Sequence, residues 1–210
     1  MSLPQALATR LRGKRLAIFD FDGTLVDSAP LHARAFAEVL APLGVAVDYA
    51  RIAGLRTDAA MRHALAAAGI AVDAARLDAL VRAKQARGRV LIAEELRALP
   101  AAAALLARLR GAVRLALVTS GSRATVRLAL GRLGWDDWFD PFVCGDDVRE
   151  AKPHPEGFRR ALALAGVAAA EAIVFEDSPV GFAAAEAAGL AWIDARDLPR
   201  LMALEASLGD

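Results

Sequence analysis

The sequence predicts an α/β fold in which a parallel sheet carries a helical insert. Two observations support this prediction. Short apolar segments typical of buried strands alternate with helical segments near the start of the chain and throughout its second half. Between about residues 28 and 100 no strand pattern appears, and apolar residues such as Leu31, Ala35, Phe36 and Val39 recur at helical spacing.

Five apolar segments are expected to form the sheet. They are Leu16–Phe19, Val113–Val118, Phe142–Cys144, Ala172–Phe175 and Leu190–Ile193. Helices are expected between them over 122–133, 155–166 and 178–189. Ser122 and Ser178 can cap a helix, Pro155 suits a first helical position, and a glycine can end each helix. The insert is expected to hold further helices near 31–40, 58–68 and 73–96.

Composition limits the class of protein. The chain has 210 residues, of which 56% are hydrophobic and 24% charged, so it predicts a well-buried globular protein. The formal net charge of +1 gives no field that would favour nucleic acid. The chain has one cysteine, Cys144, so an intrachain disulfide is excluded. Cys144 is expected to be a core residue. No apolar run could span a membrane and no signal-peptide pattern begins the chain, so a cytoplasmic location is expected.

The most informative segment is Asp20–Ser28, which directly follows the first predicted strand. Asp20 and Asp22 lie one residue apart at the carboxyl end of that strand, where open α/β sheets bind their ligands. Two acids so close repel each other, and a cation or a shared proton usually resolves the conflict. One aspartate can attack an electrophile and the other can move protons, with Mg²⁺ between them and a phosphate.

Two further segments contain groups that suit phosphate. Thr119, Ser120 and Gly121 end the second strand, where hydroxyl and amide groups can donate to anionic oxygens, although the same residues are also ordinary turn chemistry. Lys152 lies in a proline-stiffened loop before a helix, where it could offset the charge of a carboxylate and a phosphoryl group. The alternative is a solvent-exposed lysine.

A second pair of acids, Glu176 and Asp177, ends the fourth predicted strand. Hard oxygen ligands at this position suit Mg²⁺, which usually takes one or two protein carboxylates. For Asp177 alone, the alternative is an acid stabilised by the dipole at a helix amino terminus.

Taken in order, these segments resemble the four motifs of the haloacid dehalogenase superfamily, beginning with Asp-x-Asp-x-Thr. The resemblance covers nearly the whole chain. The segment Phe175–Gly181 is similar to the fourth-motif region of one branch of this superfamily, that of phosphoglycolate phosphatase and β-phosphoglucomutase-like proteins. The resemblance implies a Rossmann-like three-layer core over 1–27 and 99–210 and an inserted α-helical cap domain over 28–98.

The resemblance also implies roles for these residues. Asp20 would be the nucleophile that takes the phosphoryl group, and Asp22 the general acid and base. Gly23, Thr119, Ser120, Gly121 and Lys152 would surround the phosphate together with Asp20. Mg²⁺ would be held by Asp20, the backbone carbonyl of Asp22 and Asp177, with Glu176 assisting directly or through water.

Three residues of the insert are candidates for contact with substrate. His32 stands where related sugar-phosphate enzymes also carry histidine, although a structural helix histidine is an equal alternative. Lys84 resembles a cap lysine that faces the active site in sugar-phosphate members. Arg56 lies in a segment similar to the substrate loop of this branch. Mutases of this branch carry arginine one position later, where this chain has Thr57.

The expected function is that of a Mg²⁺-dependent phosphatase. It would hydrolyse a sugar phosphate or phosphoglycolate through an aspartyl-phosphate. A phosphohexose mutase of the β-phosphoglucomutase type is the alternative. A non-catalytic protein that binds a phosphorylated metabolite is less favoured, since every catalytic acid is intact. No nucleic-acid or membrane partner is expected, and the protein is expected to be a monomer or weak dimer.

Overall fold

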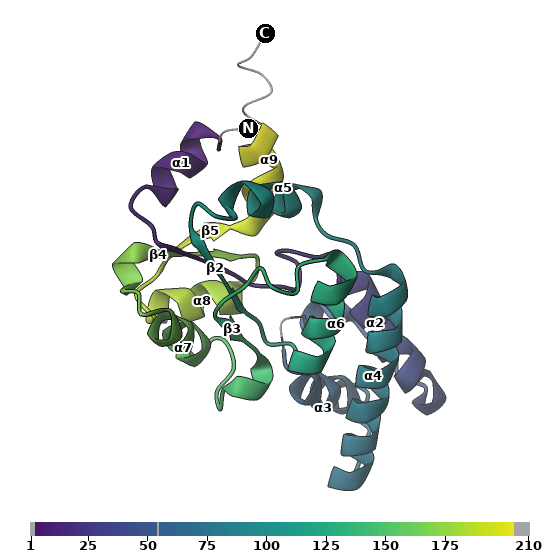
Figure 1. Cartoon of the computed structure of the whole chain (residues 1–210). Helices are drawn as coiled ribbons and strands as arrows, with labels where there is room; N and C mark the ends of the chain where they lie inside the picture. The colour runs from purple at the N-terminus through teal and green to yellow at the C-terminus, as the bar shows by residue number, and fades with distance from the viewer. Residues whose placement is uncertain (1–2, 54, 204–210) are drawn as a thin grey trace.

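The computed structural model describes residues 3–53 and 55–203. Its centre is a five-stranded parallel sheet with the strand order β3-β2-β1-β4-β5 (Figure 1). The strands are β1 (Leu16–Phe19), β2 (Arg114–Val118), β3 (Phe142–Val143), β4 (Ala172–Glu176) and β5 (Ala191–Asp194). Every predicted strand is present, with ends that differ by at most one residue. The α/β prediction is therefore confirmed.

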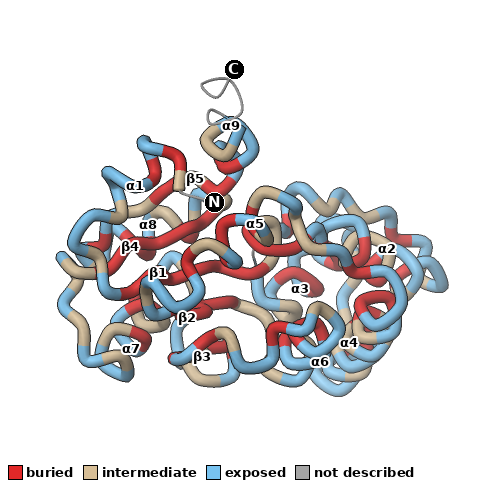
Figure 2. Tube along the Cα trace, turned by 45° about the horizontal axis from the view of Figure 1, so that its top comes forward, coloured by how far each residue is buried: buried red, intermediate tan, exposed pale blue. Residues whose placement is uncertain are grey.

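Helices cover both faces of the sheet. On one face lie α1 (Gln5–Leu11), α5 (Pro100–Leu109), α6 (Arg123–Leu133) and α9 (Leu198–Ala203), and on the other lie α7 (Glu156–Ala165) and α8 (Pro179–Ala187). Side chains of a strand alternate between faces, so Ala17 and Phe19 pack into the first layer, while Leu16 and Ile18 pack into the second. Figure 2 shows the strands as largely buried segments in the interior of the core.

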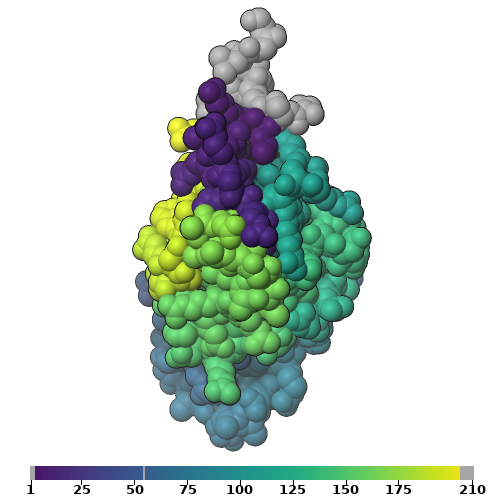
Figure 3. Space-filling view, turned by 60° about the vertical axis from the view of Figure 1, so that its left-hand side comes forward, coloured from purple at the N-terminus to yellow at the C-terminus, as the bar shows by residue number. Residues whose placement is uncertain are grey.

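The helical insert lies between β1 and β2, as predicted. It comprises α2 (Ala29–Leu40), a short 3₁₀ turn (Tyr49–Arg51), α3 (Thr57–Ala67) and α4 (Ala74–Glu95). These elements enclose an apolar cluster of their own, which includes Phe36, Leu40, Ile52, Met61 and Leu80. Figure 3 shows this segment gathered at one end of the molecule, opposite α1.

Two connecting segments join the insert to the sheet, one at each end of the insert, and they lie side by side. Val26 and Ala98 form an antiparallel bridge, and the amide of Asp27 donates to the carbonyl of Arg97 over 3.1 Å. Arg132 of α6 donates to the last carbonyls of the α4 region, Ala93, Glu94 and Leu96. These bonds fix how the insert sits above the carboxyl ends of the strands.

The helix ends agree with the sequence in part. The side chain of Ser178 accepts from the amide of Gly181 over 3.1 Å, which confirms the predicted cap. Ser122 occupies the N-cap position of α6, as predicted, but its hydroxyl donates to Thr125 and makes no capping bond to the backbone. The carboxylate of Asp146 instead accepts from the amide of Arg123, at 2.6 Å. Among the described residues, no helix combines the length and apolar character needed to cross a bilayer.

Candidate active site

The carboxyl ends of the parallel strands meet at the edge of the sheet that faces the insert. Asp20 follows β1, Thr119 follows β2, and Asp177 follows β4, so the fold brings three separate motifs together. A cavity of about 350 Å³ lies between this edge and the insert. Of the residues predicted for the site, its lining holds Asp20, Asp22, Gly23, His32, Lys84, Thr119, Ser120, Gly121, Lys152 and Asp177.

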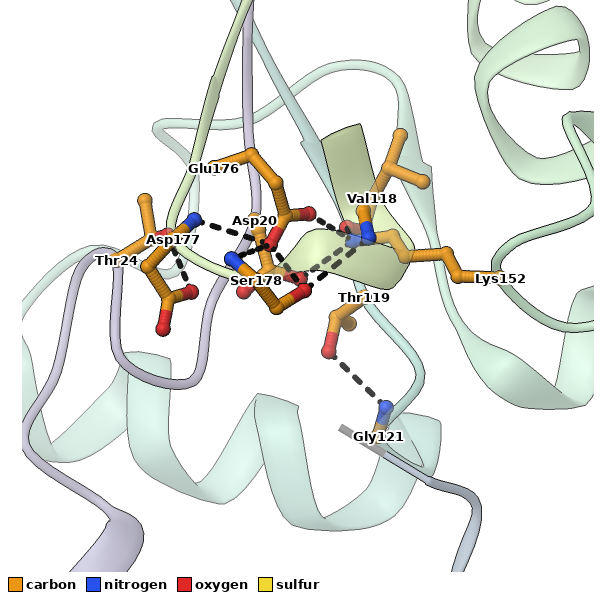
Figure 4. A network of polar contacts seen from close by, with 10 residues as sticks. Asp20, Thr24, Val118, Thr119, Gly121, Lys152, Glu176, Asp177 and Ser178 are labelled. Atoms are coloured by element: carbon orange, nitrogen blue, oxygen red, sulfur yellow. Dashed lines mark hydrogen bonds and ion pairs between the residues drawn. The ribbon is translucent and has the colours of Figure 1, made fainter. Parts of the chain in front are cut away.

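Lys152 connects two buried carboxylates at the floor of the site (Figure 4). Its Nζ donates to Oδ1 of Asp20 over 2.6 Å and to Oε2 of Glu176 over 2.7 Å. Burial and the charge of Glu176 raise the pKa of Asp20 well above its usual value, against the opposing effect of Lys152. Burial alone would lower the pKa of Lys152, but the two carboxylates outweigh it and raise that pKa. The ammonium therefore stays charged beside Asp20.

Both carboxylate oxygens of Glu176 accept hydrogen bonds from the protein. Its Oε1 accepts from the amides of Asp177 and Ser178, each at 3.1 Å, and from the hydroxyl of Ser178 at 2.9 Å (Figure 4). A Cβ at Gly181 would lie 1.9 Å from its carboxyl carbon, so only glycine leaves room for this side chain. Glu176 is 1% exposed and does not line the cavity. Its geometry suits it to position Lys152.

Asp177 presents its carboxylate to the cavity instead. Its Oδ1 accepts from the hydroxyl of Thr24 over 3.0 Å. A Cβ at Gly23 would lie 2.3 Å from its Oδ2, and Gly23 has a φ of +85°, so the first motif needs glycine here. Burial, followed by the charge of Glu176, raises the pKa of Asp177 to about 6. Its ionised form is therefore short of positive partners.

These carboxylates fit a divalent cation. Asp20, Glu176 and Asp177 can each offer an oxygen, and the three oxygens lie within 4.8 Å of one another. Hard oxygen donors of this kind suit Mg²⁺. Lys152 offsets part of the negative charge on Asp20 and Glu176, whereas Asp177 has a hydroxyl as its side-chain partner. The donor set therefore fits the predicted metal.

Asp22 is supported by a hydrogen-bonded chain that runs into the insert. The hydroxyl of Ser28 donates to Oδ1 of Asp22, and Nε2 of His32 lies 3.3 Å from the same oxygen. Burial raises the pKa of Asp22, but the hydrogen bonds from His32 and Ser28 and the charge of Lys84 outweigh it, so the pKa is lowered. This environment favours the ionised form of Asp22.

The loop after β2 supplies hydrogen-bond donors. Thr119 is 4% exposed, and its Oγ1 accepts from the amide of Gly121 over 3.0 Å, which leaves the hydroxyl proton free to donate. Ser120 lines the cavity beside it, and α6 begins two residues after Gly121. Donors grouped before a helix amino terminus suit an anionic oxygen.

A family model for haloacid dehalogenase-like hydrolases matches residues 14–189. The chain belongs to this family. It is 33% identical over 179 residues to fructose-1-phosphate phosphatase YqaB of Escherichia coli (strain K12), a match that covers 85% of this chain and 95% of the relative. It is 34% identical to hexitol phosphatase A of the same organism, over 88% of this chain and 85% of the relative.

Solved structures of related proteins have the same fold as this chain. CbbY from Rhodobacter sphaeroides in complex with phosphate superposes with a TM-score of 0.78 at 32% identity, over 86% of this chain and 85% of that one. An aspartate-to-asparagine variant of the same protein has been solved with xylulose 1,5-bisphosphate, with the same TM-score, identity and coverage. The resemblance that the four motifs carry is therefore confirmed, with a haloacid dehalogenase-like core and a helical insertion after β1.

One predicted cap residue of this haloacid dehalogenase-like hydrolase lies outside the catalytic cavity. Arg56 is exposed, pairs with Asp58 over 3.5 Å, and lines a neighbouring groove together with Ser120 and Asp146. Thr57, the next residue, lines both hollows.

Several residues of the site were not predicted. Thr24 and Ser28 bond Asp177 and Asp22, and they lie within the first motif, which is the signal that could have found them. On the insert, Phe36, Tyr49 and Ile52 line the cavity. Their segment carries no chemical motif, so the sequence offered no signal for them.

Proposed function

We propose that this chain is a Mg²⁺-dependent phosphatase that hydrolyses a small sugar phosphate through an aspartyl-phosphate at Asp20. The observation that carries the proposal is the 2.6 Å contact between Nζ of Lys152 and Oδ1 of Asp20 at the floor of the cavity. This contact holds a carboxylate beside a fixed positive charge, in a cavity that Thr119 and Ser120 also line. The names of the two Escherichia coli relatives support a sugar phosphate as substrate, and phosphoglycolate is the second candidate.

In the first step, a carboxylate oxygen of Asp20 attacks phosphorus and the bond from phosphorus to the leaving oxygen breaks. Asp22 gives its proton to that oxygen, so that an alcohol leaves. The Lys152 ammonium, the hydroxyl groups of Thr119 and Ser120 and nearby amides hold the transferred oxygens. Such positioning and charge stabilisation supply most of the catalysis in phosphoryl transfer.

In the second step, water attacks phosphorus, and Asp22 takes the proton that the water releases. The acyl-phosphate bond breaks and the carboxylate of Asp20 is regenerated. The lowered pKa of Asp22 suits this role as a base. For the first step Asp22 must carry a proton. A phosphate dianion close to Asp22 raises its pKa in that direction, because like charges disfavour ionisation.

The metal would be held by Asp20, Asp177 and the backbone carbonyl of Asp22. Glu176, whose oxygens already accept from four donors, would act through water or through Lys152. When bound, Mg²⁺ would offset the negative charge that the carboxylates and the phosphate bring together.

The test is hydrolysis of a panel of phosphorylated metabolites with Mg²⁺ and with excess EDTA. Asp20→Asn is expected to abolish turnover, because an amide cannot form the acyl-phosphate, and a fluoride analogue of phosphate should occupy the site next to Asp20. Asp22→Asn should slow both proton transfers. Full turnover in EDTA, or Asp20→Asn with a kcat near that of the wild type, would refute the proposal.

A phosphohexose mutase would form the same phospho-Asp20 and differ in what attacks next. It must keep water out and hold a second phosphate on the insert, where this chain has Thr57 in place of the arginine of the mutases. We therefore infer net release of phosphate without a bisphosphate activator. Isomer exchange that outruns phosphate release, when glucose and fructose phosphates are supplied, would reverse this inference. The division into a core of 1–27 and 99–210 and a cap of 28–98, the monomer or weak dimer and the cytoplasmic location stay predictions.

A further inference from the structure

The wall that the insert presents to the catalytic acids is mainly apolar. The lining residues from the insert are Ala29, His32, Phe36, Tyr49, Ala50, Ile52, Ala53, Leu55, Thr57 and Lys84. Among these described residues no arginine and no carboxylate appears. A leaving group seated against this wall would meet hydrocarbon over most of its surface.

The one cation of this wall is already engaged. Nζ of Lys84 lies 3.1 Å from Nδ1 of His32 and 4.6 Å from the ring centre of Phe36. On the floor, Lys152 is taken up by Asp20 and Glu176. A second phosphate or a carboxylate on the substrate would therefore be desolvated against apolar side chains without a free partner, which is strongly unfavourable.

Tyr49 differs from its neighbours in the wall. Its ring centre lies 6.3 Å from that of Phe36 and 6.5 Å from that of His32, with an angle of 24° between the Tyr49 and His32 rings. The turn that carries it is held by the carboxylate of Asp48, which accepts from the amide of Ala50 over 3.2 Å. The aromatic side chain is thus fixed in place beside the histidine that supports Asp22.

The hydroxyl of Tyr49 has no hydrogen-bond partner within the described part of the chain. Ser28, Ser178 and Thr24, by contrast, each donate to a carboxylate of the site. Burial, and then the charges of Asp22 and Asp177, raise the pKa of the Tyr49 phenol, so this hydroxyl stays protonated and able to donate. Among the described residues, this hydroxyl is therefore a free donor in a mainly apolar wall.

We propose that Tyr49 is a specificity-determining residue that binds the leaving group. Its ring packs against the C–H face of a sugar or polyol and its hydroxyl donates to a substrate hydroxyl. The preferred substrate is then the monophosphate of an uncharged polyhydroxy compound, and substrates with a second anionic group are disfavoured. This inference rests on the phosphatase function proposed above and narrows its substrate class, since it places phosphoglycolate below the sugar phosphates.

The test compares four probes: fructose 1-phosphate, fructose 1,6-bisphosphate, phosphoglycolate and p-nitrophenyl phosphate. The last has no hydroxyl in its leaving group. For the wild type, kcat/KM for fructose 1-phosphate should exceed that for the bisphosphate and for phosphoglycolate by about tenfold or more, the scale that an unpaired buried group sets. Tyr49→Phe should lower kcat/KM for fructose 1-phosphate by about tenfold, mainly through KM, because it loses one hydrogen bond.

For p-nitrophenyl phosphate, Tyr49→Phe should stay within about twofold of the wild type, whereas Tyr49→Ala should lose activity on both probes because the ring is gone. Arg51→Ala is the matched control. It lies on the same turn, pairs with Asp48 and does not line the cavity, so its substrate preference should be that of the wild type.

Two outcomes would overturn the inference. The first is Tyr49→Phe with unchanged kcat/KM for fructose 1-phosphate, and the second is a wild type that prefers the bisphosphate or phosphoglycolate. Either result with p-nitrophenyl phosphate still hydrolysed would leave the phosphatase proposal standing. If the wild type hydrolyses none of the four probes with Mg²⁺, both proposals fail together.

Discussion

Nζ of Lys84 lies 3.1 Å from Nδ1 of His32, which links α4 to α2 across the insert. Because the ammonium donates to Nδ1, the proton of the neutral imidazole is placed on Nε2, which can then donate to Asp22. Lys84 thus controls the tautomer that supports the proposed acid and base. It is a positioning residue, since it acts on Asp22 through His32.

Lys84→Met is expected to lower kcat by about tenfold and leave KM within about threefold, because the Nε2 proton of His32 is no longer fixed toward Asp22. Burial lowers the pKa of Lys84 to about 8, so its charge is costly in the fold and the methionine variant should keep or raise Tm. Arg82→Met, on the exposed side of the same helix, is the control. Unchanged kcat at every pH would show that the chain from Lys84 to Asp22 is structural alone.

A second prediction concerns the charge beneath Lys152. Glu176→Gln keeps the shape of the side chain but removes a carboxylate from a buried ion pair. Since Lys152 retains Asp20, we expect a loss of about 1–3 kcal/mol in the free energy of unfolding, below the cost of stripping a buried charge completely. Kcat should fall as well, because Lys152 would be less firmly placed against the phosphoryl group.

Denaturant unfolding of Glu176→Gln and the wild type measures this change. Glu171→Gln removes an exposed ion pair with Arg15 just before the same strand, and should change stability by less than about 0.5 kcal/mol. Equal effects of the two substitutions would contradict the role given to Glu176.

The sequence was most informative where chemistry and topology coincide. Asp20, Thr119 and Asp177 stand directly after apolar strands, and the carboxyl ends of parallel strands must meet at one edge, so their proximity followed from the pattern. The strand ends were predicted to within one residue, most directly for β1 and β4, whose apolar runs are buried on both faces.

The insert was less predictable for a physical reason. Its helices follow from periodicity, but the loop of 41–56 has no period, and packing decides which side chains turn inward. Tyr49 lines the cavity and Arg56 turns to Asp58, although the sequence had pointed to the arginine. The short helices α1 and α9 were missed because each buries few residues, Leu7 and Leu198 among them, against a sheet that distant segments build.

Arg132 yields a third prediction. Its guanidinium donates to the carbonyls of Glu94 at 2.8 Å and of Leu96 at 3.1 Å, at the carboxyl end of α4. A cation at a helix carboxyl terminus is also stabilised by the negative end of the helix dipole. Arg132→Ala should lower stability by about 1 kcal/mol, as expected for a partly exposed site, and raise KM because the insert is less firmly seated.

Arg132→Lys separates charge from geometry, because lysine keeps the charge but cannot reproduce the planar fork. Compared with Arg132→Ala, it should regain part of the lost stability, but its KM should stay close to the raised value. Arg127→Ala, exposed on the same helix, is the control. A KM that does not move in Arg132→Ala would mean that the bridge between Val26 and Ala98 alone is enough to seat the insert.

The last prediction follows from Asp177, whose pKa burial and Glu176 raise to about 6 from 3.8. As pH rises from about 4, the unfolded chain releases this proton first. The folded state therefore binds more protons up to about pH 6, and Asp177 lowers the free energy of unfolding over that range. Above pH 6 the full penalty is present, and a cation bound to the ionised carboxylate would offset it. Millimolar Mg²⁺ should therefore raise Tm clearly at pH 7.5 and much less at pH 5.

Asp177→Asn, which can still accept from Thr24, should raise the metal-free Tm at pH 7.5 and abolish the rise with Mg²⁺. Asp78→Asn, exposed on α4, should behave as the wild type does. The same Mg²⁺ response at both pH values, or a full response in Asp177→Asn, would place the cation elsewhere.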